Sequence, residues 1–372
     1  MCIDFENKYL PWLILKEIPK LGIRSLNRLL TRFESPERIL SATEEELARV
    51  DGLKSAPIQG IRNHKEFIPA ARKELKRALD SGIKLVTLPD PHYPALLKKI
   101  DDPPPILYYK GTLEKQLPCI AMVGSRRATA YGLNTARQLS KQLADKGLVI
   151  VSGMARGIDT AAHQGALDAG GRTLAILGSG LKKIYPKENK NLFNEIVKTG
   201  AVISEFKLDT DPFPYNFPAR NRIIAGLSCG TVVVEAAQKS GSLITARLSA
   251  EYNREVFAVP GSIKSKKSQG THALLKQGAK LVENETDVLD EISHFVEISD
   301  SPLKQIPEPN RLVLDKEGKT VYQLLDPYPR HIDQIIEAAP LDSATVGAVL
   351  LELELQGYVQ QHPGNYFSTS EE

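Results

Sequence analysis

The sequence predicts an α/β fold in which an extended Rossmann-like, doubly wound sheet is flanked by an N-terminal helical domain and a C-terminal winged-helix domain. Three observations support this prediction. Short runs rich in β-branched residues alternate with helical segments through the middle of the chain, a polar stretch with three prolines follows Leu289, and 372 residues exceed one ordinary domain. The 42% hydrophobic and 25% charged residues are usual for a globular protein.

Residues 1–80 are predicted to form a helical domain that resembles SAM-like and helix-hairpin-helix modules. Apolar residues recur at helical spacing in three segments, and glycine-containing turns separate them. Ser41 is expected to cap the third helix, with Glu44 completing a capping box. Hairpins of this kind can bind the DNA backbone, but a plain helical packing domain explains the pattern equally well. The three helical segments are 10–18, 23–33 and 41–50.

The central domain is predicted to span residues 81–296. Pro103, Pro104 and Pro105 cannot lie inside a helix or a central strand, so they mark a boundary or an extended connector. Beyond them, short apolar runs are separated by segments with helical periodicity, which indicates a parallel sheet covered on both faces. The predicted strands are 119–123, 148–151, 173–177, 201–203, 231–234 and 256–259.

A linker over residues 297–311 and a winged-helix domain over residues 312–372 are predicted to follow. Residues 331–372 contain no lysine or arginine and seven acidic residues, whereas a domain that binds duplex DNA needs cations. We therefore expect this domain to contact another protein or to have a regulatory role, and not to bind duplex DNA. Its predicted elements are three helices and a hairpin, at 319–325, 331–339, 343–357 and 358–367.

The positive charge is concentrated in the central domain. The whole chain carries a formal charge of +3, but residues 120–275 contain 21 Lys and Arg against 11 Asp and Glu, which leaves −7 for the rest. Such localisation is typical of a surface that binds a polyanion, although ordinary solvated surfaces also carry surpluses of this size.

The N-terminus lacks the basic and apolar regions of a signal peptide, and no run of about 18 uncharged apolar residues suggests a membrane span. The three cysteines, Cys2, Cys119 and Cys229, have no metal-binding spacing. We therefore expect a cytoplasmic protein in a reducing compartment, with no bound metal and no cofactor.

Ligands of a doubly wound sheet bind beyond the carboxyl ends of the strands, where loops lead into helix N-termini. Small residues there let an anion approach the backbone N–H groups, and arginine or lysine adds charge. Five such loops in this chain combine small residues with basic or polar ones. Their candidate phosphate-binding residues are Gly124, Ser125, Arg126, Arg127, Gly153, Arg156, Lys182, Lys183, Lys187, Arg220, Asn221, Arg222, Ser240, Gly241 and Ser242.

The class of phosphate ligand is narrowed by motifs that the sequence lacks. No P-loop motif occurs, so the sequence does not support ATP hydrolysis of that type. Gly178 and Gly180 begin a dinucleotide-binding pattern, but Lys183 stands where its third glycine belongs. Basic and glycine-rich loops without hydrolytic machinery favour a longer polyphosphate chain, namely nucleic acid. Aromatic candidates for base stacking are Tyr185, Phe206, Phe213 and Phe217.

Several long segments, in this order, resemble the DNA processing protein A family (DprA, also called Smf). They include VGSRRATAYG at 123–132, SGMARGIDTAAHQGAL at 152–167, FPARNRIIAGLS at 217–228 and VFAVPG at 256–261. The resemblance covers roughly residues 100–290. It implies a non-catalytic protein that binds and protects single-stranded DNA during natural transformation and loads the RecA recombinase. It also implies homodimers that form through the nucleotide-fold domain.

The resemblance assigns phosphate contacts to three of the five loops. Gly124, Ser125 and Arg126 would hold phosphates, as would Gly153, Arg156 and the basic stretch 182–187. Residues 220–222 match the family's FPxRNR segment, in which Arg222 is either a DNA contact or a structural pin to the sheet.

Catalytic alternatives rest on four residues. Asp159 and His163 are one helical turn apart and could form an acid–base pair, although a structural contact is favoured because no nucleophile is near in sequence. Cys229 is interpreted as a small core residue. Glu235 follows a segment similar to that of nucleotide phosphoribohydrolases of the lysine-decarboxylase-like group, but Ser228 and Cys229 replace its paired glycines.

Overall fold

The computed structural model describes residues 2–115, 118–293, 316–326, 329–356 and 358–369. The chain forms two compact units, Met1–Ser299 and Asp300–Glu372, and each is described by itself. The predicted linker at 297–311 lies outside the described residues.

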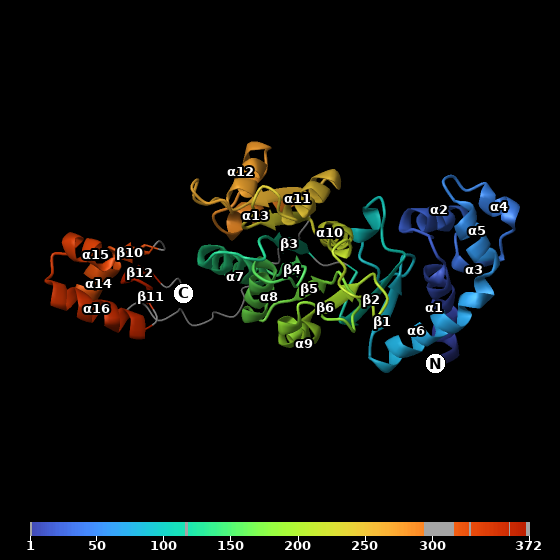
Figure 1. The fold of residues 1–372 in the computed structure, drawn as a ribbon, viewed down its shortest axis with the longest axis horizontal. Helices are drawn as coiled ribbons and strands as arrows, with labels where there is room; N and C mark the ends of the chain where they lie inside the picture. Colours follow the sequence, from blue (N-terminus) through green and yellow to red (C-terminus); the bar gives the residue numbers. More distant parts are fainter. Residues whose placement is uncertain (1, 116–117, 294–315, 327–328, 357, 370–372) are drawn as a thin grey trace. The chain divides into compact units, whose positions relative to one another are not determined.

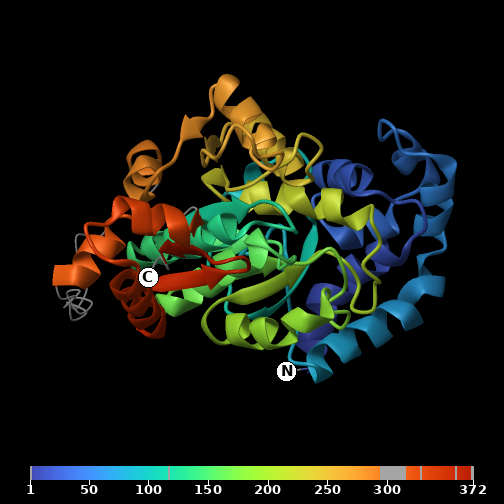
Figure 2. The same cartoon turned by 60° about the vertical axis from the view of Figure 1, so that its left-hand side comes forward.

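Six α-helices and one 3₁₀ helix precede the sheet in the described part of the first unit. They pack around a core of their own that includes Leu15, Leu29 and Ile61, and they lie beside β1 and β2 at one edge of the sheet (Figures 1 and 2). The bounds are α1 Cys2–Glu17, α2 Ile23–Phe33, α3 Pro36–Ser41, α4 Glu44–Ala48, α5 Ser55–Arg62, η1 His64–Phe67 and α6 Ile68–Asp80.

The capping box predicted at Ser41 and Glu44 is wrong in position. Ser41 is the last residue of α3, and the extended Ala42 that follows separates it from α4. The box forms two residues later, where the Thr43 side chain accepts from the Glu46 N–H and the Glu46 carboxylate accepts from the Thr43 N–H. Two overlapping S/T-x-x-E patterns stand in the sequence, and the end of α3 decides between them.

The predicted Rossmann-like sheet is confirmed. It has nine strands in the order β1-β2-β6-β5-β4-β3-β7-β8-β9, and all pairs from β6 to β9 are parallel. Each of the six predicted strands is present, with its ends within one residue of the prediction. The bounds are β1 Lys84–Thr87, β2 Ile106–Gly111, β3 Cys119–Val123, β4 Val149–Ser152, β5 Thr173–Ile176, β6 Ala201–Ser204, β7 Gly230–Val233, β8 Glu255–Ala258 and β9 Lys280–Leu281.

Strands β1 and β2 extend the sheet in a way that the sequence did not predict. Strand β2 begins immediately after the three prolines and pairs antiparallel with both β1 and β6. Pro104 still takes part in packing, because its carbonyl oxygen accepts a 2.9 Å hydrogen bond from the Tyr93 hydroxyl. The prolines therefore end before the strand and do not interrupt it.

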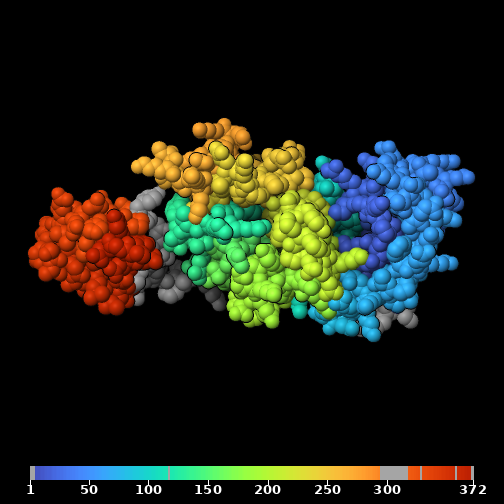
Figure 3. All heavy atoms as spheres, in the orientation of Figure 1, coloured from blue at the N-terminus to red at the C-terminus, as the bar shows by residue number. Residues whose placement is uncertain are grey.

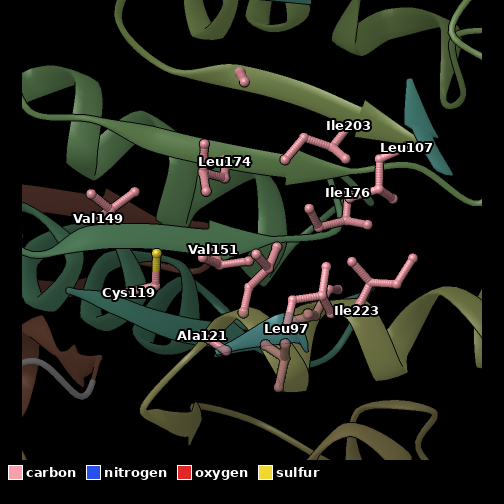
Figure 4. Packing of buried hydrophobic residues seen from close by; sticks show 14 of the residues in the cluster. Leu97, Leu107, Cys119, Ala121, Val149, Val151, Leu174, Ile176, Ile203 and Ile223 are labelled. Carbon is pink, nitrogen blue, oxygen red and sulfur yellow. The ribbon is translucent and has the colours of Figure 1, made fainter. Parts of the chain in front are cut away.

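Helices cover both faces of the sheet. On one face, Ile223 of α10 packs over Val151 and Ile176, as Figure 4 shows. On the other, α7 and α8 pack on alternate residues of the same strands, such as Ile120 and Ile150. The bounds are η2 Leu97–Lys99, α7 Ala130–Asp145, α8 Ile158–Asp168, η3 Lys187–Asn189, α9 Lys190–Thr199, α10 Asn216–Leu227, α11 Ser242–Glu251, α12 Gln269–Lys276 and α13 Glu285–Ile292.

The second unit has the predicted winged-helix architecture. Three helices and a three-stranded sheet of order β10-β12-β11 enclose a core that includes Val321, Ile335 and Leu350. By length and composition, no single helix in the described ranges could cross a membrane; only α15 and α16 together could, and they are bent by 118°. The bounds are α14 Lys316–Tyr322, β10 Arg330–His331, α15 Ile332–Ala338, α16 Ser343–Leu355, β11 Val359–His362 and β12 Tyr366–Thr369.

Lys16 connects helix α1 to the sheet. Its ammonium group donates to the carbonyl oxygen of Glu205 and lies 5.6 Å from the centre of the Tyr108 ring. Burial lowers the pKa of Lys16 to about 8, although the carboxylate of Glu205 acts in the opposite direction.

We expect Lys16 to make stability depend on pH. Above pH 8 the folded chain holds Lys16 neutral, whereas the unfolded chain keeps it protonated up to about 10.5, so the free energy of unfolding rises with pH in this window. The gain of wild type over Lys16→Met should approach about 3 kcal/mol by pH 10.5. Denaturant titrations followed by Trp12 fluorescence at pH 7 and 10 measure it. Equal changes in the two proteins would show that Lys16 is solvated.

Candidate nucleic-acid interface

The loops that follow strands β3, β4, β5, β6, β7 and β8 meet at one edge of the sheet because these strands are parallel. A cavity of about 600 Å³ at this edge brings seven candidate residues together: Gly124, Ser125, Arg126, Asn221, Ser240, Gly241 and Ser242. A second cavity, of about 210 Å³, is lined by Arg126 and by three further candidates: Arg127, Gly153 and Arg156. The other five, Lys182, Lys183, Lys187, Arg220 and Arg222, line neither cavity.

Two glycines allow the loops after β3 and β4 to approach each other. A Cβ on Gly124 would lie 2.6 Å from Cγ1 of Ile158 and 3.0 Å from the carbonyl oxygen of Glu235, so no side chain fits there. Gly157, at the N-cap of α8, has a φ of 76°, which glycine adopts without strain. The Ile158 N–H can then donate to the carbonyl oxygen of Ser125 at 3.2 Å. The loops after β3 and β4 are therefore joined directly by a backbone hydrogen bond.

Arg126 and two aromatic rings form a wall between the two cavities. The Arg126 guanidinium lies 4.8 Å from the centre of the Phe217 ring, and the Phe217 and Tyr185 rings are 5.9 Å apart. All three side chains line both cavities, and Tyr185 is 42% exposed. Phe217 orients the guanidinium without neutralising it, so the arginine keeps its charge for an anionic ligand.

The loop at residues 240–242, which we call the Ser-Gly-Ser loop, also lines the larger cavity. Gly241 is the exposed N-cap of α11, and the first N–H groups of this helix donate within the loop, to the Ser240 hydroxyl and to the carbonyl oxygens of Ser240 and Gly241. The Ser240 and Ser242 hydroxyls are 2.7 Å apart, and the Asn221 side chain donates to the carbonyl oxygen of Gly241 at 3.3 Å. Asn221 therefore positions the loop and also lines the cavity.

The exposed cations at this edge differ in whether a carboxylate already neutralises them. Arg156 pairs with Glu188, and Lys183 lies 3.3 Å from Asp211. Among the candidate residues, all of which the structure describes, four other exposed cations form no ion pair: Arg126, Arg127, Lys182 and Lys187.

Arg220 is buried, which overturns its interpretation as a phosphate contact. Its side chain is behind the second loop, where it donates to the carbonyl oxygens of Gly153, at 2.7 Å, and Ile176. A Cβ on Gly153 would lie 2.2 Å from the Arg220 guanidinium. Burial lowers the pKa of Arg220 to about 10, while the nearby Asp159 raises it. Gly153 and Arg220 thus support the site from beneath.

Arg222 has the contacts expected of a structural pin, one of the two roles that the sequence left open. Its side chain is buried, forms an ion pair with Glu205 and donates to the carbonyl oxygen of Asp102 at 2.7 Å. It holds α10 against the segment before β2. A buried guanidinium with these partners does not reach a ligand in either cavity.

The residues considered for catalysis have structural partners. Asp159 accepts from the backbone N–H groups of Gly153, at 3.1 Å, and Ala155, at 3.3 Å, whereas His163 Nδ1 lies 2.6 Å from Oγ1 of Thr173. Burial lowers the pKa of His163 to about 3, so the ring is neutral. Asp159 and His163 therefore do not form an acid–base pair.

Glu235 and Cys229 also have partners within the fold. The Glu235 carboxylate accepts from the Thr129 N–H at 3.0 Å and from the Thr129 hydroxyl, and Thr129 is the N-cap of α7. The buried Cys229 thiol donates to the carbonyl oxygen of Cys119, and burial raises the pKa of Cys229 to about 11. Across the described ranges, no three His, Cys, Asp or Glu side chains are grouped to hold a metal ion.

Two residues of this edge, Lys239 and Tyr215, were not singled out from the sequence. Lys239 is exposed and lines the larger cavity beside the Ser-Gly-Ser loop. Tyr215 stacks on Phe213 with ring centres 5.4 Å apart, and the two are 70% and 44% exposed. Lys239 could have been detected as a cation next to a loop of small residues. Tyr215 could have been detected as an aromatic residue in a proline-rich segment before a helix.

Comparison with known families identifies the group of proteins to which the chain is related. The family described as DNA recombination-mediator protein A matches residues 84–293, more than half of the chain. The chain belongs to this family. The DprA winged helix domain matches residues 305–365.

Several DprA-family proteins are similar over most of their length. Protein Smf of Synechocystis sp. is 34% identical, over 95% of this chain and 96% of that protein. The crystal structure of DprA from Streptococcus pneumoniae has a TM-score of 0.67 and 38% identity, covering 75% of this chain and 95% of its own. The structure of Helicobacter pylori DprA, which concerns the single-stranded DNA binding mode of that protein, has a TM-score of 0.51 and 32% identity, covering 57% and 96%.

Proposed function

We propose that this protein binds single-stranded DNA by its phosphate backbone along the carboxyl edge of the central sheet. In this proposal it acts as a homodimer, does not alter the DNA chemically, protects incoming strands during natural transformation and passes them to the RecA recombinase. The observation that carries the proposal is the convergence of glycine- and serine-rich loops with exposed cations that no carboxylate neutralises among the described residues.

The wall of Arg126, Phe217 and Tyr185 supports a single strand over a duplex. Bases of a single strand are free to stack on aromatic rings, whereas those of a duplex are stacked on each other. The cavities on either side of the wall, about 600 and 210 Å³, have room for bases that are not stacked on one another. Phosphates then lie near Arg126 and Arg127.

The hydrogen bonds of Glu235 make the phosphoribohydrolase alternative weaker than the DNA-binding proposal. The Glu235 carboxylate accepts two hydrogen bonds from Thr129, the N-cap residue of α7. An acid or base in a hydrolase needs to reach the substrate. Membership of a recombination-mediator family also favours a binding role. The RecA and dimer assignments rest on this family membership.

The proposal predicts affinity that depends on salt but little on base sequence. Five cations at this edge, namely Arg126, Arg127, Lys182, Lys187 and Lys239, would give a slope of log affinity against log salt of about −3.5 for a single strand. Affinity should then fall about a hundredfold between about 50 and 200 mM salt. Fluorescence anisotropy with labelled oligothymidylate, a mixed-sequence oligonucleotide and a duplex measures this. Tighter binding of the duplex, or affinity independent of salt, would contradict the proposal.

A further inference from the structure

The loop at residues 261–268, between β8 and α12, also lies at the carboxyl edge of the sheet. We call it the lysine loop because it contains Lys264, Lys266 and Lys267. Ile263 near its tip is 87% exposed. The loop lines neither of the two cavities described above. In Figure 3 the orange segment around α12 stands out from the surface of the first unit.

Hydrogen bonds fix the base of the lysine loop to the candidate site. The Ala236 N–H donates to the carbonyl oxygen of Lys267 at 2.7 Å, and the Gly270 N–H donates to that of Ala236 at 2.7 Å. Ala236 directly follows Glu235, which accepts hydrogen bonds from Thr129, the N-cap residue of α7. From α7, the Tyr131 hydroxyl donates to the carbonyl oxygen of Pro260 at 3.0 Å, just before the loop. The loop therefore has a defined position relative to the loops after β3 and β7.

The charge of the lysine loop is not neutralised locally. Lys264 and Lys266 are exposed, and no described carboxylate forms an ion pair with either ammonium group or with that of Lys267. Two serine side chains shape the loop instead: Ser262 accepts from the Lys264 N–H at 3.3 Å, and Ser265 from the Lys267 N–H at 3.2 Å. Three lysines on one short loop, beside an exposed isoleucine, form a cationic and apolar surface.

We propose that the lysine loop is a second anchor for the DNA strand held at the βα loops. Lys264 and Lys266 contact phosphates, and Ile263 packs against a base or sugar. This inference rests on the proposed function. From β3, whose following loop carries Arg126, to β8 there are two strand intervals of about 4.8 Å, so the two anchors are on the order of 10 Å apart. At about 3.4 Å per nucleotide, a strand needs about three nucleotides to span them.

The test compares oligothymidylates of 2 and 20 nucleotides, lengths chosen below and above the roughly three-nucleotide span. Lys264→Ala/Lys266→Ala should weaken binding of the longer strand about tenfold at about 100 mM salt and make its salt slope shallower by about 1.4, while the short strand is unaffected. A matched control is Lys141→Ala/Lys146→Ala, which removes two exposed lysines at the far end of α7. Circular dichroism and the unfolding midpoint confirm that each variant is folded.

The apolar contact is tested separately with Ile263→Ser. It should weaken binding of the long strand about threefold without changing the salt slope, because no charge is removed. If Lys264→Ala/Lys266→Ala binds the long strand with wild-type affinity and slope while Arg126→Ala is impaired, the second anchor is wrong and the proposed function remains. If neither variant is impaired, the proposed function itself is wrong.

Discussion

Arg126→Ala is expected to weaken binding of single-stranded DNA by about thirtyfold. The substitution removes one charge-assisted contact to phosphate, worth about 2 kcal/mol, which corresponds to about thirtyfold in affinity. It also removes the guanidinium that lies 4.8 Å from the Phe217 ring, so the wall between the two cavities changes. The salt slope should become shallower by about 0.7. Anisotropy titrations with oligothymidylate at several salt concentrations measure both quantities.

Two further variants separate charge from shape at this position. Arg126→Lys keeps the positive charge but not the planar group that stacks on Phe217, so it should retain the wild-type salt slope and recover only part of the affinity. Arg172→Ala is the matched control, because Arg172 is an exposed arginine immediately before the amino end of β5, paired with Glu114. Loss of affinity in the control as large as in Arg126→Ala would mean that net charge, and not the site, governs binding.

The central strands and the loops of the candidate site could be predicted because their signals are local. All five residues of β3 are buried, so the strand is a continuous apolar run in the sequence. The alternation of strands and helices then indicates that these strands are parallel, which places Gly124, Ser125 and Ser240 at one edge.

The roles of Arg220 and Arg222 could not be predicted, because their partners are distant in sequence. The carbonyl oxygens that accept from Arg220 belong to residues 67 and 44 positions away, and the Asp102 carbonyl that accepts from Arg222 is 120 positions away. A motif shows that an arginine stands at a helix start, but the position of its acceptors depends on how α10 packs. Strand β2 escaped prediction for a similar reason, since its antiparallel partners are β1 and β6.

Glu205→Ala is expected to destabilise the first unit by about 3 to 5 kcal/mol. The Glu205 and Arg222 side chains are 7% and 8% exposed, and the substitution leaves the guanidinium buried without its main counter-charge. The unfolding midpoint should fall by roughly 6 to 15 °C. The fluorescence of Trp12, the only tryptophan in the chain, follows this transition because the residue is packed in a core shared by α1 and the sheet.

The comparison that distinguishes a structural pin from a DNA contact uses both stability and salt dependence. Glu251→Ala removes an exposed carboxylate paired with Arg247 and should change stability by less than about 0.5 kcal/mol. Glu205→Leu/Arg222→Met should be less destabilised than Glu205→Ala, because apolar groups replace both charges together. If Arg222 contacted phosphate, this double variant would lose about 0.7 of the salt slope. If Arg222 is a structural pin, the folded double variant should keep the wild-type salt slope of DNA binding.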